Sequence, residues 1–296
     1  MWKLIGILAL IIQLSIHAAV IEPVNEVALK SDDNYIVEDR EFFKCYLTEV
    51  KSSKDQVKVT STTLEMDKLK SLNNRIFILI SGNKNYPEYF PKDLGTFVDG
   101  ITGIKYEATP LKYITRDDFK GMASKLYSIN LQNNQIEEIP FDTFYDLPKL
   151  AFLNVRDNKI KSLPPNLFTN SPVFISLVII SNKLTALHAD LFKDCPAFEI
   201  LRAEFNQIEE LHEDLFKNNP NMTIISMKHN KIRNIPMDFN RFELLGVADF
   251  THNGGTCDTM YFSFKPFVET YDEEEQKKLI KTVPEFQQKI EEVCRQ

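Results

Sequence analysis

The chain has 296 residues, of which 43% are hydrophobic, 26% charged and 11% aromatic, and its 35 basic and 42 acidic residues give a formal net charge of −7. This balance excludes a disordered chain, a collagen and a coiled-coil rod. The negative charge, the lack of a basic cluster and the lack of a glycine-rich phosphate loop among only 9 glycines argue against nucleic acid, nucleotides and anionic membranes as partners.

Residues 1–19 have the pattern of a secretory signal peptide. Lys3 precedes an apolar run from Leu4 to Ile16, and Ala18 and Ala19 offer small residues for cleavage. The run is shorter than the roughly 20 apolar residues that cross a bilayer. We therefore expect a secreted, extracellular protein without membrane insertion.

Residues 20–76 are expected to form an N-terminal cap. Apolar stretches at 42–50 and 56–59, followed by the run at 76–80, are separated by Lys, Ser and Asp turns and predict a β-rich structure. Cys45 lies in this region with no obvious partner nearby. Its thiol is either free or links two chains in a covalent dimer.

Residues 77–253 contain an internal repeat of 24 residues. The repeat is marked by asparagines at a pitch of 24, with a last gap of 23, namely Asn134, Asn158, Asn182, Asn206, Asn230 and Asn253. Each asparagine lies in the same frame, as in Leu126-x-x-Ile129-x-Leu131-x-x-Asn134-x-Ile136-x-x-Ile139-Pro140. Upstream, the frame persists in weaker form, with Thr109 in the asparagine position.

This frame resembles the leucine-rich repeat of extracellular proteins. The resemblance implies an α/β solenoid of about eight coils, a horseshoe with a parallel β-sheet on its concave face and irregular or short helical turns on its convex side. The asparagine amides are expected to hydrogen-bond backbone groups of their own and adjoining coils. A stacked aromatic spine is expected from one phenylalanine per coil, namely Phe119, Phe144, Phe168, Phe192, Phe216 and Phe239.

Residues 254–296 are expected to form a C-terminal cap of two short helices. Cys257 directly follows the last coil and Cys294 ends the terminal helix, so we predict a disulfide between them. Cys195 occupies an inward position of the repeat and is predicted to be a small buried hydrophobic residue.

The outward positions of the strands are not fixed by the repeat, so a partner would be recognised there. An apolar group flanked by charges stands out, and the candidate binding residues are Phe152, Arg156, Val178, Ile180, Ile200, Arg202, Glu204, Ile224, Lys228 and Val247. Such a group is typical of an interaction surface when it is exposed and contiguous. The equally weighted alternative is that neighbouring side chains or a cap cover it.

The sequence offers little sign of catalysis or cofactor binding. His188 and His212 share one position in consecutive coils, as do His229 and His252, but neither pair has a clear third or fourth ligand, so no metal or cofactor is predicted. Catalytic motifs such as G-x-S-x-G and H-E-x-x-H are absent from the sequence, and we expect no enzymatic activity. The sequon at Asn221 predicts N-glycosylation.

As a whole, the chain resembles secreted leucine-rich repeat proteins of animals, especially the small insect type related to Toll-like ectodomains and mosquito immune repeat proteins. The resemblance implies a binding protein that recognises a protein or glycan on its concave face, with innate immunity as one role; the alternative is a structural protein of the extracellular matrix or of adhesion. The chain departs from those families in having one cysteine in its N-terminal cap and no long C-terminal coiled coil.

Overall fold

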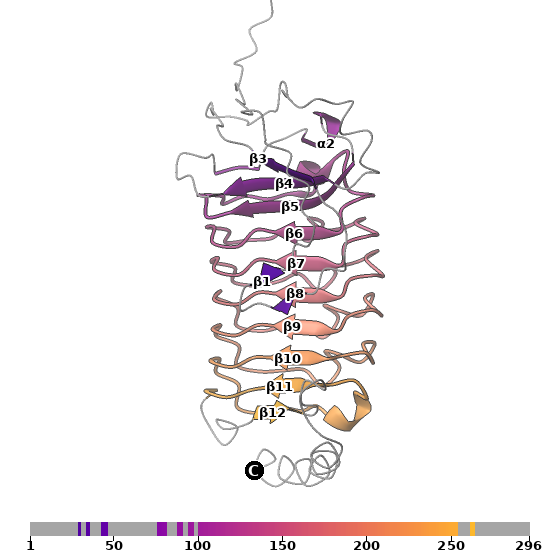
Figure 1. Ribbon diagram of the computed structural model, residues 1–296. Helices are drawn as coiled ribbons and strands as arrows, with labels where there is room; N and C mark the ends of the chain where they lie inside the picture. The colour runs from indigo at the N-terminus through magenta and orange to yellow at the C-terminus, as the bar shows by residue number, and fades with distance from the viewer. Residues whose placement is uncertain are drawn as a thin grey trace, which may run out of the picture.

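The computed structural model describes residues 29–30, 34–35, 43–46, 76–81, 88–90, 94–97, 100–253 and 261–263. In this part of the chain the coils stack into a solenoid in which every coil adds one strand to a ten-stranded sheet (Figure 1). The strands follow one another in chain order and are β3 (Phe43–Tyr46), β4 (Ile76–Ser81), β5 (Ile101–Glu107), β6 (Ser128–Asn130), β7 (Phe152–Asn154), β8 (Ser176–Val178), β9 (Ile200–Arg202), β10 (Ile224–Ser226), β11 (Val247–Asp249) and β12 (Tyr261–Ser263).

The sheet is parallel from β3 to β11, and β12 pairs with β11 in the antiparallel direction. A separate antiparallel pair joins β1 (Leu29–Lys30) and β2 (Asn34–Tyr35). Helical structure in the described residues is limited to α2 (Leu94–Phe97) and the 3-10 turns η1 (Arg116–Phe119) and η2 (Phe239–Arg241). The predicted fold class, a solenoid with a parallel sheet and mostly irregular returns, is confirmed.

Repeat length fixes the register of the sheet. Strands β6 to β10 start 24 residues apart, so equivalent side chains face one another across every pair; Phe152 lies opposite Ser176, and Ile200 lies opposite Ile224. Alternate residues of each strand point inward, and Ile129, Leu153, Leu177, Leu201 and Ile225 are buried in a continuous core.

The predicted asparagine ladder is confirmed. Each ladder amide donates from Nδ2 to a carbonyl oxygen of the preceding coil at 2.7–3.0 Å and to one of its own coil. The amide oxygen of each asparagine from Asn158 to Asn253 accepts a backbone N–H of the preceding coil at 2.9–3.0 Å. Asn134 Oδ1 accepts two bonds from Thr109 of the preceding coil, the backbone N–H at 3.1 Å and the side-chain hydroxyl at 2.6 Å. The sharp turn after every strand therefore leaves these polar groups satisfied within the core.

The aromatic spine is confirmed for the first five of its six predicted members and corrected at the sixth. Rings 119, 144, 168, 192 and 216 follow one another at centroid distances of 5.9–6.3 Å. Beyond Phe216 the next ring is Phe242, 6.3 Å away, and not the predicted Phe239, which packs on Phe242 and Phe250. The 3-10 turn η2 interrupts the frame of this coil, and the side chain that reaches the spine comes from three residues later.

Several expectations fall on other parts of the chain. The signal peptide at 1–19, the helices of the C-terminal cap and the cysteines Cys257 and Cys294 lie outside the described residues. Cys45 lies in β3 opposite Ile78 of β4, so the parallel sheet extends into the region predicted as the N-terminal cap, while a dimer through its thiol stays a prediction. Among the described residues, no helix is both long enough and apolar enough to cross a bilayer.

Cys195 is the buried free thiol that the sequence predicts. Burial raises its pKa to about 12, so the reactive thiolate is scarce at neutral pH. We expect iodoacetamide at pH 8 to leave Cys195 unmodified in the native protein and to modify it fully after unfolding in urea. Mass spectrometry of the peptide that contains Cys195 measures this, and equal labelling rates in the two states would contradict the burial.

Candidate binding surface

The outward side chains of β6 to β11 form the sheet face, and the predicted binding residues come together there. Register pairing places Phe152, Ile200, Ile224 and Val247 in one column, interrupted by Ser176. These four apolar side chains are half-buried. From β9 to β11 the column is continuous, and we call its three members Ile200, Ile224 and Val247 the apolar column.

Exposure is not uniform among the ten candidates. Val178, Ile180 and Glu204 are only 1%, 5% and 2% exposed, so for these three candidates the alternative of burial holds. Parallel strands lie about 4.8 Å apart, and each side chain is flanked by its equivalents on both neighbouring strands. Val178 lies in register between Asn154 and Arg202, whose side chains extend further from the backbone than valine.

Charged groups on the sheet face are largely paired side by side. Arg202 Nε donates to Glu204 Oε1 at 3.1 Å, and Arg156 Nε donates to Asp157 Oδ2 at 3.0 Å. The second oxygen of the Glu204 carboxylate, Oε2, is buried without a hydrogen bond. At the edge where β9 begins, burial raises the pKa of the half-buried Glu199 carboxyl.

The two halves of the sheet face differ in chemistry. From β5 to β7 polar side chains bind one another: Asn154 Nδ2 donates to Gln132 Oε1 at 3.0 Å, Gln132 donates to Glu107, and Lys105 pairs with Glu107 at 2.8 Å. From β9 to β11 the apolar column takes over. The half from β9 to β11, which leaves apolar side chains partly exposed to solvent, is therefore the stronger candidate for binding.

A second column follows the edge of the sheet face, at the residue that precedes each ladder asparagine or, in the first coil, Thr109. Its members all adopt positive φ angles of 52–58° and are Ala108, Asn133, Asp157, Ser181, Phe205, His229 and His252. We call it the left-handed column. Phe205 stacks on His229 with ring centroids 4.3 Å apart and 14° between the planes, and His229 stacks on His252 at 4.3 Å and 8°.

Sequence reasoning missed this stack. The sequence pattern identified His229 and His252 as a shared position but did not connect Phe205 with them. A sequence signal exists, because aromatic or imidazole rings occupy the position before the ladder asparagine in three consecutive coils. The bulky Phe205 is the notable member, since Asn, Asp and His tolerate a left-handed backbone far better, and its conformation costs about 1 kcal/mol.

Both histidine pairs have structural roles. His188 Nδ1 accepts the N–H of Asp190 at 3.0 Å, and His212 Nδ1 accepts that of Asp214 at 3.1 Å, so each ring caps a local turn. The rings of His229 and His252 are parallel, and one metal ion cannot lie in both ring planes. Within the described residues, no group of three or more His, Cys, Asp or Glu side chains is arranged to hold a metal ion.

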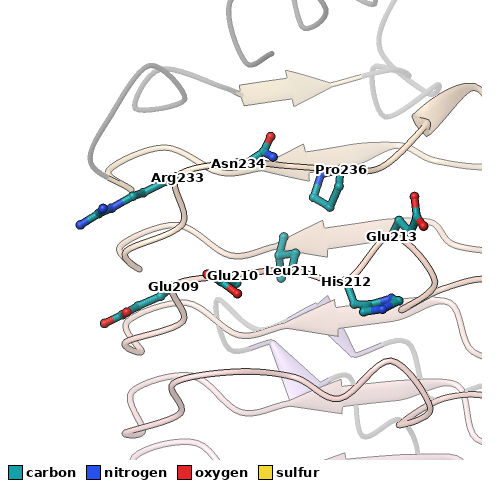
Figure 2. A pocket seen from close by; sticks show the side chains of 8 residues that line it. All are labelled: Glu209, Glu210, Leu211, His212, Glu213, Arg233, Asn234 and Pro236. Atoms are coloured by element: carbon teal, nitrogen blue, oxygen red, sulfur yellow. The ribbon is translucent and has the colours of Figure 1, made fainter. Parts of the chain in front are cut away.

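A shallow pocket of about 500 Å³ lies away from the sheet, between the coils that follow β9 and β10. Figure 2 shows that its lining comes from two successive turns, with Glu209 and Arg233 at one side and His212 and Glu213 at the other. Leu211 and Pro236 supply its apolar lining. The remaining lining is polar and charged, whereas ligand pockets are usually lined mainly by apolar and aromatic side chains.

The sequon asparagine Asn221 is exposed, three residues before β10 begins. Thr223 of the sequon donates its hydroxyl to the backbone oxygen of Glu199 at 3.2 Å. A glycan attached to Asn221 would leave the molecule at the edge of the sheet opposite the left-handed column.

Comparisons with known proteins agree with this geometry. The family model described as leucine rich repeat matches residues 111–160 and 124–173. The solved structure of a TLR13–ssRNA13 complex is similar with a TM-score of 0.56 and 22% identity over 70% of this chain and 28% of that chain. The Toll–Spätzle complex of Drosophila matches with a TM-score of 0.32 and 19% identity over 67% of this chain and 36% of that chain.

The similarity to the first structure is one of fold, and the fold is that of a leucine-rich repeat solenoid. The chain spans about a third of the length of the solved chains that it matches. A comparison with curated proteins gives no match.

Proposed function

We propose that the chain is a secreted, non-enzymatic binding protein that recognises a protein or glycan partner through the sheet face between β9 and β11. The observation that carries the proposal is the apolar column, three half-buried branched side chains in strict register on a surface where polar residues are the rule. Arg202 and Lys228 border the column. An apolar centre with a charged rim is the usual composition of a protein interface.

A protein partner is favoured over RNA, although the TLR13 structure holds a single-stranded RNA. The chain carries a net charge of −7, and the cations Arg156 and Arg202 on the sheet face are already paired with carboxylates. Binding of a phosphate backbone draws on a surplus of unpaired positive charge over a long surface.

The extracellular setting of this proposal rests on the sequence pattern of residues 1–19, and innate immune recognition rests on the resemblance of the repeat frame. The alternative is a structural protein of the extracellular matrix or of adhesion. Affinity capture from body fluid or conditioned medium separates the two: one stoichiometric soluble partner supports recognition, whereas retention on insoluble matrix supports the structural role.

Replacing Ile200 and Ile224 by aspartate is expected to weaken binding of the captured partner at least tenfold, or about 1.4 kcal/mol, because two charges would be desolvated at the centre of the interface. Both side chains are half-buried on the surface, so the variants retain the core. Ile180 is unsuitable for this test because its side chain is 5% exposed. Isothermal titration calorimetry measures the affinity.

Phe141→Asp is the matched control, since Phe141 is 70% exposed and lies outside the sheet. It replaces an apolar surface residue by the same charge. Unchanged affinity in the folded Ile200→Asp, Ile224→Asp double variant would show that the partner binds elsewhere.

A further inference from the structure

The stack on the left-handed column stops at Ser181. One face of the Phe205 ring lies on His229, while the side chain in the next coil along the column is only a serine. Phe205 is 48% exposed. The ring stack therefore ends in an aromatic ring with an open face.

The backbone places Ser181 in the same relation to Phe205 as Phe205 has to His229. Ser181 N donates to Glu204 O at 2.9 Å, and Phe205 N donates to Lys228 O at 3.0 Å. Because the two links are equivalent, a planar group above Ser181 would stack on Phe205 at the spacing of the existing rings, near 4.3 Å. One ring position in a regular stack is vacant.

The conformation of Phe205 gives a second, independent indication. Its φ angle of 55° is the left-handed one in which bulky residues are rarely found. Asparagine in the same position, as at Asn133, would fit without strain. A strained residue whose side chain is also half-exposed contributes little to the core, and such residues cluster where ligands bind.

Charge indicates the chemistry of the occupant. Lys159, Lys183 and Lys228 lie on the coils around the vacancy, and within the described residues no ion pair at 4.0 Å or less involves them. Lys161 and, more weakly, Lys159 and Lys183 lower the pKa of the Glu137 carboxyl, so two of the three also act on a carboxylate of the chain. The carboxylate nearest in the column, Asp157, is already bound by Arg156. The surroundings of the vacancy thus favour negative over positive groups.

We infer that the partner inserts one aromatic side chain, flanked by carboxylates, above Ser181 and against the open face of Phe205. This inference rests on the proposed function and specifies the chemistry of the partner. The aromatic side chain completes the stack, and the flanking carboxylates pair with the lysines around the vacancy.

The experiment titrates the isotope-labelled full chain with the tripeptides Ac-Asp-Trp-Asp-NH2, Ac-Asp-Leu-Asp-NH2 and Ac-Lys-Trp-Lys-NH2, and with laminarihexaose as a glycan probe, followed by NMR chemical shifts. We expect saturable shifts at Ser181, Lys183 and Phe205 with the first peptide, and at least tenfold weaker binding of the leucine and lysine peptides. Equal binding of the leucine peptide, or binding of laminarihexaose alone, overturns the inference.

Two variants test the same vacancy in opposite ways. Phe205→Asn removes the ring and relieves the backbone, while Ser181→His fills the vacancy with a ring that the column already carries at His229 and His252. Both variants are expected to bind Ac-Asp-Trp-Asp-NH2 with at least tenfold lower affinity than the wild type. Asn133→His is the matched control: it places a ring in the same left-handed position two coils from Ser181, and the affinity should stay at the wild-type value.

The natural partner separates this inference from the proposed function. If Ile200→Asp and Ile224→Asp abolish its binding while Phe205→Asn and Ser181→His leave it unchanged, the sheet face binds the partner without the vacancy and the inference is wrong. Loss of binding in both sets of variants supports both.

Discussion

Phe192→Ala is expected to lower the free energy of unfolding by about 3–5 kcal/mol, as large-to-small changes of buried aromatic residues do. Phe192 is fully buried at the middle of the spine. Its ring centroid lies 4.0 Å from that of Phe198, 6.1 Å from Phe168 and 6.0 Å from Phe216. Removal of the ring leaves a cavity that three other rings border, and these cannot collapse into it without breaking their own stacking.

Urea unfolding followed by far-UV circular dichroism measures this loss. Phe141→Ala serves as the control, because Phe141 is 70% exposed and its truncation should change stability by less than about 0.5 kcal/mol. Phe192→Leu should fall between the two, since leucine refills part of the volume. A Phe192→Ala variant as stable as the Phe141→Ala control would mean that the spine does not hold the coils together.

Asn182→Leu is expected to cost about 3 kcal/mol or more, although leucine is more hydrophobic and similar in size. Asn182 Nδ2 donates to Val155 O at 3.0 Å, and Asn182 Oδ1 accepts the N–H of Ile160 at 2.9 Å. Both partners belong to the preceding coil and are left without their bonds in the variant. Each orphaned buried group costs roughly 1–3 kcal/mol.

Gln207→Leu is the matched control, since Gln207 is exposed and follows a ladder asparagine directly. The same change of side-chain class there should be close to neutral. Hydrogen exchange of the Ile160 amide reports the ladder bond itself: it should exchange much faster in Asn182→Leu than in the wild type. A stable variant with a protected Ile160 amide would show that another group replaces the asparagine.

The repeat frame made most of the fold predictable from the sequence. A ladder asparagine every 24 residues determines where each strand ends and which strands pair. The register of the sheet, the identity of the inward-facing residues and the stacking of the phenylalanines from Phe119 to Phe216 therefore follow from the repeat period alone. The prediction of Phe239 as the next ring is wrong because η2 changes the length of that return, and a period cannot foresee a local turn.

The candidate site was predictable in position but less so in exposure. The repeat period shows that Val178 and Ile180 lie at outward positions. Whether they reach solvent depends on the side chains of both neighbouring strands, and both residues are buried. The left-handed column was harder still. A φ angle is a property of the turn, and nothing in the apolar pattern marks Phe205 as the residue that adopts it.

The reversed direction of β12 bears on how a second copy of the chain could add to the sheet. A parallel sheet that ended at β11 would offer an open edge of the same polarity as the first strand of another copy, and head-to-tail addition at such edges does not close on itself and yields fibres. β12 occupies that edge with its backbone running the other way, through the pairs Val247–Ser263, Ala248–Phe262 and Asp249–Tyr261. A further copy would meet a strand of reversed direction there, so continuation of the parallel sheet into a second copy would require displacement of β12.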